Sequence, residues 1–232
     1  MTELKHWAIF GAEISLQSAF FVELLKGNVP VILKELGGKK GALFSNFTLN
    51  KFIKEEAIHD DYSLSEAEHR SIQTFSSGEQ RKALLNYLLA SRPDFLVLDN
   101  VFDMLDVESR DNLTHRLTQL SLEIPIIQIV KRKSNLLPFI TNAIRIHNDE
   151  VSFSASVNDY FRRFEKENQI ELTETLPPPL EEIVPAGNPV IVFKNVGVSY
   201  GDRQIVKNIN WKINSGDFWQ LMGPNGSGKT TL

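Results

Sequence analysis

Apolar and polar residues alternate along the first two thirds of the chain in blocks that predict strands and helices in turn. Short continuous apolar runs are typical of strands that are buried on both faces of a sheet. Longer segments with helical periodicity separate these runs, and this alternation favours a parallel sheet covered by helices. The predicted strands are Trp7–Phe10, 42–44, 95–98 and 126–130, and the predicted helices are 16–26, 47–58, 79–90 and Val107–Leu120.

Residues 165–188 interrupt this pattern. They contain six Glu, one Lys and four of the ten prolines of the chain, including the run Pro177-Pro178-Pro179. Prolines favour extended conformations and a strongly acidic segment cannot build a core, so we expect a linker here. Apolar runs at 190–193, 204–206, 209–213 and 218–222 then predict a second, strand-rich region. We therefore predict a domain over 1–155, an acidic Pro-rich linker over 156–188 and the start of a second domain over 189–232.

Composition and charge narrow the class of protein. The 232 residues are 42% apolar and 23% charged, which is enough to bury a core. The formal net charge of −4 argues against a general polyanion-binding protein, and nothing here points directly to nucleic acid. The absence of Cys excludes disulfides, a thiol nucleophile and a Cys metal site. No apolar run approaches the roughly 18 residues of a membrane span, so we expect a cytoplasmic α/β protein.

One motif carries recognisable chemistry. The run Gly223-Pro224-Asn225-Gly226-Ser227-Gly228-Lys229-Thr230 matches G-x-x-x-x-G-K-[ST], the phosphate loop or Walker A motif. Its glycines allow consecutive backbone N–H groups to turn towards an anion, and Lys229 can reach the β- and γ-phosphates. Thr230 is the candidate Mg²⁺ ligand. We expect residues 223–230 and Thr231 to bind ATP with Mg²⁺.

The region around this loop resembles the start of an ATP-binding cassette (ABC) domain. In that family an aromatic residue ahead of the loop stacks on adenine, and Tyr200 occupies the matching place. An ordinary tyrosine at a strand end is the alternative interpretation of this residue. The resemblance implies the fold of a P-loop NTPase, with a parallel sheet core and a helical subdomain, followed by the antiparallel start of a second cassette.

A second resemblance lies upstream. Phe75-Ser76-Ser77-Gly78-Glu79-Gln80-Arg81 resembles the ABC signature, which in the family meets the γ-phosphate of a nucleotide on the facing cassette. This implies that Ser76, Ser77, Gly78 and Glu79 act across an interface, although a plain Ser-capped helix explains the same residues. The order of motifs favours the signature, because 93–99 resembles the Walker B strand and Met104-Leu105-Asp106 resembles the D-loop.

The first domain carries a degraded counterpart of the phosphate loop. When the chain is aligned with itself at an offset of 212 residues, Trp7, Gly11, Ser15 and Ser18 fall on Trp219, Gly223, Ser227 and Thr230. This counterpart lacks two glycines and the lysine of the phosphate loop, and each of these three losses opposes phosphate binding. An added carboxylate opposes it further. The replacements are Ile14 for Gly226, Leu16 for Gly228, Gln17 for Lys229 and Glu13 for Asn225.

The catalytic positions implied by the family are also altered in the first domain. Asn100 follows Asp99 where the family has its catalytic Glu, and an amide cannot act as a general base. Lys131 or Arg132 stands in the place of the switch histidine, and no Q-loop glutamine is found near Ser45-Asn46. We expect 1–155 to be a degenerate cassette and no catalytic set to be complete in this chain.

These features together resemble the soluble tandem ABC ATPases known as molybdate-transport or photorepair ATP-binding proteins. The resemblance implies one competent composite site, formed by the second Walker A and the first signature, with the second cassette cut off just after Walker A. We expect the full-length parent to hydrolyse ATP, with the remainder of the second cassette as its intramolecular partner. We expect this chain alone to be inactive. A non-hydrolysing ATP sensor and the ATP-binding subunit of a membrane transporter stay open, as does an unidentified membrane or soluble partner.

Overall fold

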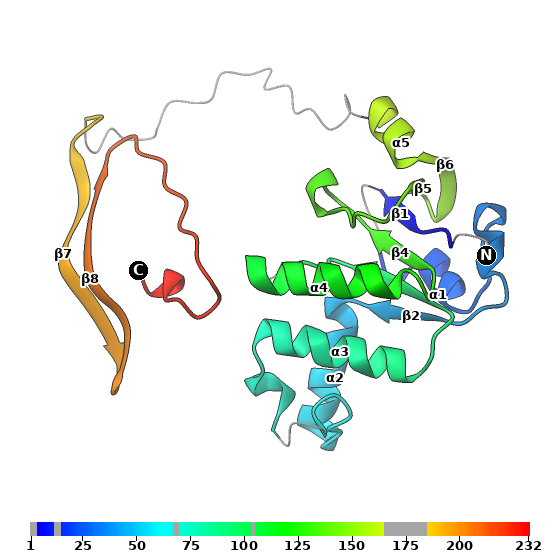
Figure 1. The fold of residues 1–232 in the computed structure, drawn as a ribbon, viewed down its shortest axis with the longest axis horizontal. Coiled ribbons are helices and arrows are strands. Elements are labelled where there is room, and N and C mark those ends of the chain that lie inside the picture. Colours follow the sequence, from blue (N-terminus) through cyan, green and yellow to red (C-terminus); the bar gives the residue numbers. More distant parts are fainter. Residues whose placement is uncertain (1–3, 12–14, 67–69, 104, 165–184) are drawn as a thin grey trace. The chain divides into compact units, whose positions relative to one another are not determined.

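The computed structural model describes residues 4–11, 15–66, 70–103, 105–164 and 185–232. It divides into two units (Figure 1). Most of the chain up to Gln169 forms the first unit, and Ile170–Leu232 supplies most of the second. None of the helices in the described ranges is long and apolar enough to cross a membrane.

The first unit is built on a six-stranded sheet with the strand order β2-β3-β4-β1-β5-β6. Neighbouring strands run parallel from β2 to β5, and β6 is antiparallel to β5. This arrangement confirms the predicted parallel core. The strands are β1 (Trp7–Phe10), β2 (Gly41–Phe44), β3 (Phe95–Asp99), β4 (Ile126–Ile129), β5 (Asn142–His147) and β6 (Glu150–Ser156).

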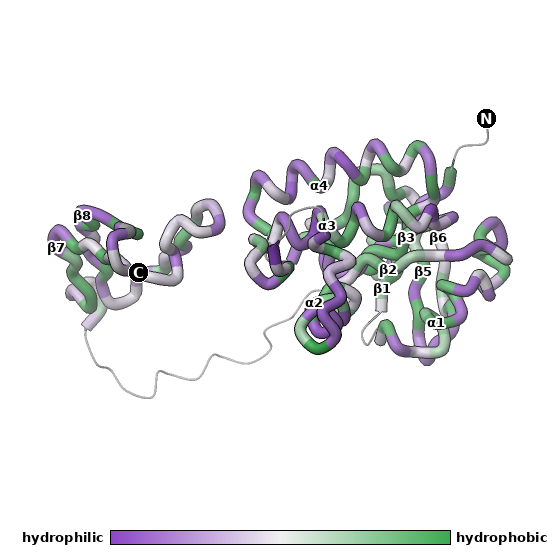
Figure 2. Tube along the Cα trace, turned by 90° about the horizontal axis from the view of Figure 1, so that it is seen from below, coloured by the Kyte–Doolittle hydropathy of each residue, from purple (hydrophilic) through white to green (hydrophobic). Residues whose placement is uncertain are grey.

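Alternate residues of the central strands enter two different hydrophobic clusters, one on each face of the sheet. In β1, Trp7 and Ile9 join the cluster that contains α1, whereas Ala8 and Phe10 join the cluster that contains α3 and α4. Burial on both faces explains why these strands consist of continuous apolar runs, which appear green in Figure 2. The helices of the first unit are α1 (Ala19–Leu25), α2 (Asn46–His59), α3 (Ser77–Ala90), α4 (Val107–Leu120) and α5 (Val157–Phe164).

Short 3₁₀ helices complete the first unit. The segment between α2 and α3 contains η3 (Ile72–Thr74), which leads directly into the predicted signature. Together, α2, η3 and α3 form the helical subdomain that the sequence predicts. The fully described residues of this unit also form η1 (Val31–Leu36) and η4 (Lys133–Asn135).

The second unit contains a long antiparallel hairpin formed by β7 (Pro189–Tyr200) and β8 (Arg203–Asn214). The separately predicted runs 204–206 and 209–213 therefore belong to one strand. The 3₁₀ helix η5 (Lys229–Thr231) follows at the end of the described chain.

Three predictions are corrected by the structure. Residues 157–164 form α5, whose Tyr160 stacks on Phe10, so the first unit ends later than the predicted boundary at residue 155. The helix predicted at 16–26 begins only at Ala19, after a turn. Residues 218–222 form no strand, because no strand of the described second unit pairs with them and Phe218 is fully exposed. Most of the predicted linker, together with Glu13 and Ile14, lies outside the described residues.

Candidate functional site

The phosphate loop of the second unit is curled around its own lysine. Gly226 and Gly228 have φ values of 78° and 86°, a left-handed conformation that glycine adopts without steric cost. The ammonium group of Lys229 donates hydrogen bonds to the carbonyl oxygens of Gly223, at 2.8 Å, and Pro224, at 2.6 Å. The cation therefore lies within the loop, where it can exchange these carbonyl partners for phosphate oxygens.

Gly228 is constrained by its surroundings as well as by its backbone. A Cβ atom at this position would lie 2.8 Å from Ile205 Cγ2 and 2.9 Å from Val206 Cγ1, both on β8. These methyl groups belong to β-branched side chains that are stiff at χ1, so they cannot easily move aside. Only glycine therefore fits this position.

Tyr200 and Thr230, the predicted adenine and Mg²⁺ contacts, lie on different elements of the second unit. Tyr200 is the last residue of β7 and pairs with Arg203 across the turn at Gly201. Its side chain is 66% exposed, which leaves the ring face accessible to a planar ligand. Thr230 lies in η5, directly after Lys229.

The predicted signature lies at the N-terminus of α3. Ser76 is the N-cap, and its hydroxyl accepts a hydrogen bond from Glu79 N at 3.3 Å. Glu79 in turn accepts from Ser76 N at 2.7 Å, which completes a capping box. Hydrogen bonds from Ser76 and the nearby Arg70 hold the pKa of the Glu79 carboxyl below its ordinary value. The positive end of the helix dipole makes the N-terminus of α3 a suitable electrostatic environment for an anion.

Gly78 in this signature is packed closely against α4. A Cβ atom on Gly78 would lie 3.2 Å from Ser109 Oγ. The N-terminus of α3 and the first turns of α4 also line a pocket of about 450 Å³, which includes Ser76, Gly78 and Glu79. The predicted signature residues therefore border an open recess in the first unit.

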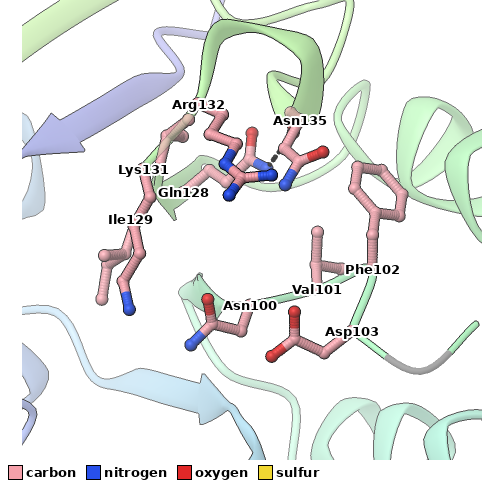
Figure 3. Close-up of a pocket in the computed structure, with 10 residues that line it drawn as sticks. Asn100, Val101, Phe102, Asp103, Gln128, Ile129, Lys131, Arg132 and Asn135 are labelled. Carbon is pink, nitrogen blue, oxygen red and sulfur yellow. Dashed lines mark hydrogen bonds between the residues drawn. The ribbon is translucent and has the colours of Figure 1, made fainter. Parts of the chain in front are cut away.

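The carboxyl ends of β3 and β4 form another pocket in the first unit, of about 330 Å³ (Figure 3). Asn100 and Asp103 lie on one side of this pocket, and Arg132 and Asn135 face them across it. Lys131 also lines the pocket. Asn100 and Lys131, which are predicted to replace the family's glutamate and histidine, therefore line one pocket, as the adjacent ends of parallel strands allow.

The electrostatics of this pocket centre on Asp99, the last residue of β3. Burial raises the pKa of the Asp99 carboxyl above its ordinary value, while the Lys131 charge and a hydrogen bond from Asn100 oppose this change. Asn100 Nδ2 donates to Asp99 Oδ2 at 3.2 Å, and Asn100 has a left-handed φ of 47°. Asn tolerates this conformation better than most residues do. Asn100 therefore acts as a neutral hydrogen-bond donor here and offers no basic group.

The degraded loop of the first unit differs from its counterpart in the part that is described. Leu16, which aligns with Gly228, is not among the described residues with positive φ. Gln17 N donates to Ser15 Oγ at 3.3 Å, and Ser18 N donates to Ser15 O at 3.1 Å. Ser18 Oγ is buried and has no hydrogen-bond partner among the described residues. Backbone donors that would face a phosphate are thus used within a local turn.

Sequence reasoning missed the role of Arg81, the last residue of the predicted signature run. Its side chain is buried, and it donates to Asn46 Oδ1 at 2.7 Å and to Asp103 O at 3.3 Å. Burial lowers the pKa of the Arg81 guanidinium, while Asp103 and Asp99 raise it. Arg81 therefore ties α3 to the segment after β3 and to the start of α2. The only signal in the sequence is its position immediately after the signature.

The glycine-rich loop, the capped α3 and the pocket at the ends of β3 and β4 define a P-loop NTPase of the cassette type. Residues 206–232 match the family model described as ABC transporter. The chain belongs to the ATP-binding cassette family.

Two curated relatives match most of this chain but little more than a third of their own lengths. The chain is 35% identical over 172 residues to the ABC transporter ATP-binding protein ModF of Escherichia coli, a match that covers 70% of this chain and 35% of ModF. It is 30% identical over 190 residues to an uncharacterised ABC transporter ATP-binding protein of Schizosaccharomyces pombe, covering 79% and 38% respectively. The matched region thus spans little more than a third of each relative.

Solved structures support the fold. A complex of the archaeal ribosomal stalk protein aP1 with the ribosome recycling factor aABCE1 superposes with a TM-score of 0.60 at 15% identity, covering 98% of this chain and 54% of that one. A model of ribosome-bound archaeal Pelota and ABCE1 gives 0.66 at 14% identity, covering 98% and 47%. At these identities the likeness concerns the fold alone.

Proposed function

We propose that this chain is the N-terminal part of a tandem ABC ATPase with one competent nucleotide site. That site joins the phosphate loop of the second cassette to the signature of the first, Ser76–Glu79. The observation that carries this proposal is the contrast between two loops at matching sequence positions. The second loop keeps its lysine and left-handed glycines, whereas Leu16 and Gln17 replace two of these residues in the first.

The residues present fit ATP and Mg²⁺ at the second loop. Lys229 is held beside the curl of the loop by two carbonyl oxygens, so phosphate oxygens can take over its hydrogen bonds with little rearrangement. Thr230 offers a hydroxyl to Mg²⁺, and Tyr200 offers an exposed ring to adenine. A bound Mg²⁺ supplies charge neutralisation on the phosphates, and Lys229 adds a second positive charge.

Ser76 and the N-terminus of α3 would act on the γ-phosphate from the facing cassette. The capping box fixes the first turn of α3, so the positive end of the helix is oriented before nucleotide arrives. The attacking water needs a positioned base and a Walker B aspartate at this site. We propose that both come from the remainder of the second cassette, because the region matched in the relatives covers only 35% and 38% of their lengths.

In this proposal, the first cassette keeps the signature that the second cassette needs. It has lost the residues for ATP hydrolysis at its own site. Asn100 carries no base, and Lys131 places a positive charge beside Asp99 where the family has a histidine. Its capped signature helix is complete. The two halves would therefore differ in role: one donates the signature, and the other binds the phosphates.

Calorimetric titration with Mg-ATP and a phosphate-release assay test this proposal on the 232-residue chain and on the longer protein that contains it. We expect weak binding and no turnover by the chain, and tight binding with steady turnover by the longer protein. Steady turnover by the 232-residue chain would contradict the proposal. Tight binding without turnover by the longer protein would favour the ATP-sensing alternative.

A further inference from the structure

A buried carboxylate in the helical subdomain lies outside every motif discussed so far. Glu56, on α2, is only 5% exposed. Its two oxygens accept hydrogen bonds from Ser65 Oγ at 2.8 Å, from Ser71 Oγ at 2.5 Å and from Ile72 N at 3.0 Å. Glu56 therefore bonds to two parts of the chain that precede the predicted signature. One is Ser65, and the other is Ser71 with Ile72.

The contacts of Glu56 continue directly into the signature helix. Ile72, whose N–H is held by Glu56, accepts a hydrogen bond at its carbonyl from Gln80 Nε2 at 3.0 Å. Ser71 caps η3 through a bond from Gln73 N. A continuous chain of contacts thus runs from α2 through η3 to the first turns of α3.

A second set of contacts supports the same segment. The Arg70 guanidinium stacks over the Phe75 ring at 4.4 Å and pairs with Glu79, the carboxylate of the capping box. Arg70 is adjacent to Ser71, so a shift of Ser71 would also displace the partner of Glu79. The position of the Ser76–Glu79 turn therefore depends on where Glu56 fixes residues 71 and 72.

The charge of Glu56 strengthens this arrangement. The groups that the described residues direct at its two oxygens are two hydroxyls and one backbone N–H, each able to donate. Burial opposes ionisation, but the bonds from Ser71, Ser65 and Ile72 outweigh it, and the pKa of Glu56 lies below its ordinary value. A glutamine has the same shape, but it carries no charge and its NH₂ group cannot accept. Only its amide oxygen could accept the bonds from Ser71 Oγ and Ile72 N, and these bonds would lose the strength that the negative charge gives them.

We propose that Glu56 is a positioning residue for the signature: its carboxylate fixes the 70–76 segment and thereby sets the position of the α3 N-terminus. This inference deepens the proposed function, on which its catalytic consequence rests. Glu56 itself touches neither nucleotide nor signature. It acts through Ser71, Ile72 and Gln80.

Hydrogen–deuterium exchange of the 232-residue chain tests the structural step. In Glu56→Gln, we expect the amides of residues 70–80 to exchange about tenfold faster or more, because hydrogen bonds to a charged group are lost. The amides of β1 and β3 should be unchanged. Glu55→Gln is the matched control: it removes the neighbouring charge, which is exposed and pairs only with His59 among the described residues, and it should leave residues 70–80 unchanged.

Two outcomes of this experiment would overturn the proposal. The first is an unchanged amide exchange rate over residues 70–80 in Glu56→Gln. The second is an exchange rate that increases equally in residues 70–80 and in β1 and β3, because this would indicate a global loss of stability. If Glu56→Gln does not fold, Ser71→Ala replaces it, because this variant removes one donor and keeps the carboxylate. A smaller but local increase over residues 70–80 is then expected, and no increase would overturn the proposal.

Kinetics of the longer protein test the catalytic consequence. Glu56→Gln should lower kcat for ATP hydrolysis and leave KM unchanged, because the phosphate loop at Lys229 is intact while the signature is displaced. A raised KM with unchanged kcat would contradict a role in positioning the signature. If the unaltered longer protein releases no phosphate, the proposed function fails, whereas the exchange experiment still decides whether Glu56 fixes residues 70–80.

Discussion

The two loops at matching positions in the two units share Gly11/Gly223 and Ser15/Ser227, but their backbones adopt different conformations. In the second unit, Gly226 and Gly228 are left-handed and Lys229 is enclosed by the loop. In the first unit, the described part of the loop forms a local turn around Ser15, in which the N–H groups of Gln17 and Ser18 are already bonded. The second loop also contains a local bond, from Ser227 N to Pro224 O at 3.3 Å, so the described difference between the loops lies in the left-handed glycines and the lysine.

We propose that the first loop has lost a phosphate site through its glycines as well as through its cation. A leucine at the position of Gly228 would need a left-handed conformation that L-residues avoid at a cost of about 1–2 kcal/mol. The first loop has instead a conformation in which Leu16 is unstrained. The sheet beneath it is intact, because its strands are held by burial on both faces.

Replacing Gly228 by Ala should have the largest effect on the second loop. The new Cβ would meet Ile205 and Val206 at less than 3 Å in addition to the left-handed strain. We expect ATP affinity of the longer protein to fall by more than about tenfold in calorimetry. Gly216→Ala is the matched control, since Gly216 has a φ of 88° and nothing within 4 Å. Equal losses in both variants would show that the contact with β8 is irrelevant.

Ser76→Ala should reduce turnover at the second loop, although the residue lies in the first unit. The variant removes the N-cap bond to Glu79 N, which is worth about 0.5–2 kcal/mol, and also the hydroxyl proposed to meet the γ-phosphate. Ser156→Ala provides a comparison, because Ser156 Oγ accepts from Asp159 N at the start of α5 in the same way. Phosphate release should fall only in Ser76→Ala, and a similar fall in both would argue against a role across the interface.

Gln17→Lys should leave the first loop without ATP affinity. The variant restores the cation, but Leu16 still prevents the backbone from curling towards phosphate. Calorimetry on the 232-residue chain that also carries Lys229→Ala isolates this loop. Micromolar ATP binding by that double variant would mean that the cation alone separates the two loops.

Asp99→Asn should have the smallest effect, and it concerns the stability of the first unit. Burial raises the pKa of Asp99 in the folded state above the ordinary value of 3.8, so its ionised form opposes folding. The penalty is present at neutral pH and disappears as pH falls through the folded pKa. Urea unfolding should therefore show Asp99→Asn to be more stable than the unaltered chain at neutral pH. The difference in unfolding free energy between the two proteins should become smaller near pH 4. A difference that does not change with pH would mean that it arises from packing and not from the charge of Asp99.

Much of the first unit could be predicted from the sequence because its strands are continuous apolar runs. Burial on both faces allows no other pattern, so Trp7–Phe10 was predicted with the bounds that β1 has. The start of α3 was also readable, since Ser76 and Glu79 form a capping box that is local in sequence. The family resemblance placed the candidate site residues, and the structure brings Asn100 and Lys131 to one pocket.

The features that could not be predicted depend on contacts between distant residues. The helix α5 follows β6 and lies within the range predicted as acidic linker, 156–188. Its position is set by Tyr160, which stacks on Phe10. The roles of Arg81 and Glu56 arise from partners on other elements, and no local pattern marks a charge as buried. The run 218–222 has the composition of a strand, but a strand also needs a neighbour to accept its hydrogen bonds.

The central claim is that two unequal cassettes share one competent site. The most direct test compares Lys229→Ala with Asn100→Ala in the longer protein. Both variants should be assayed for steady-state phosphate release from Mg-ATP under identical conditions. We predict that Lys229→Ala abolishes turnover, because the phosphates lose their cation. Asn100→Ala should leave turnover nearly unchanged, because Asn100 serves a site that does no chemistry. Equal losses of turnover in the two variants would contradict the account.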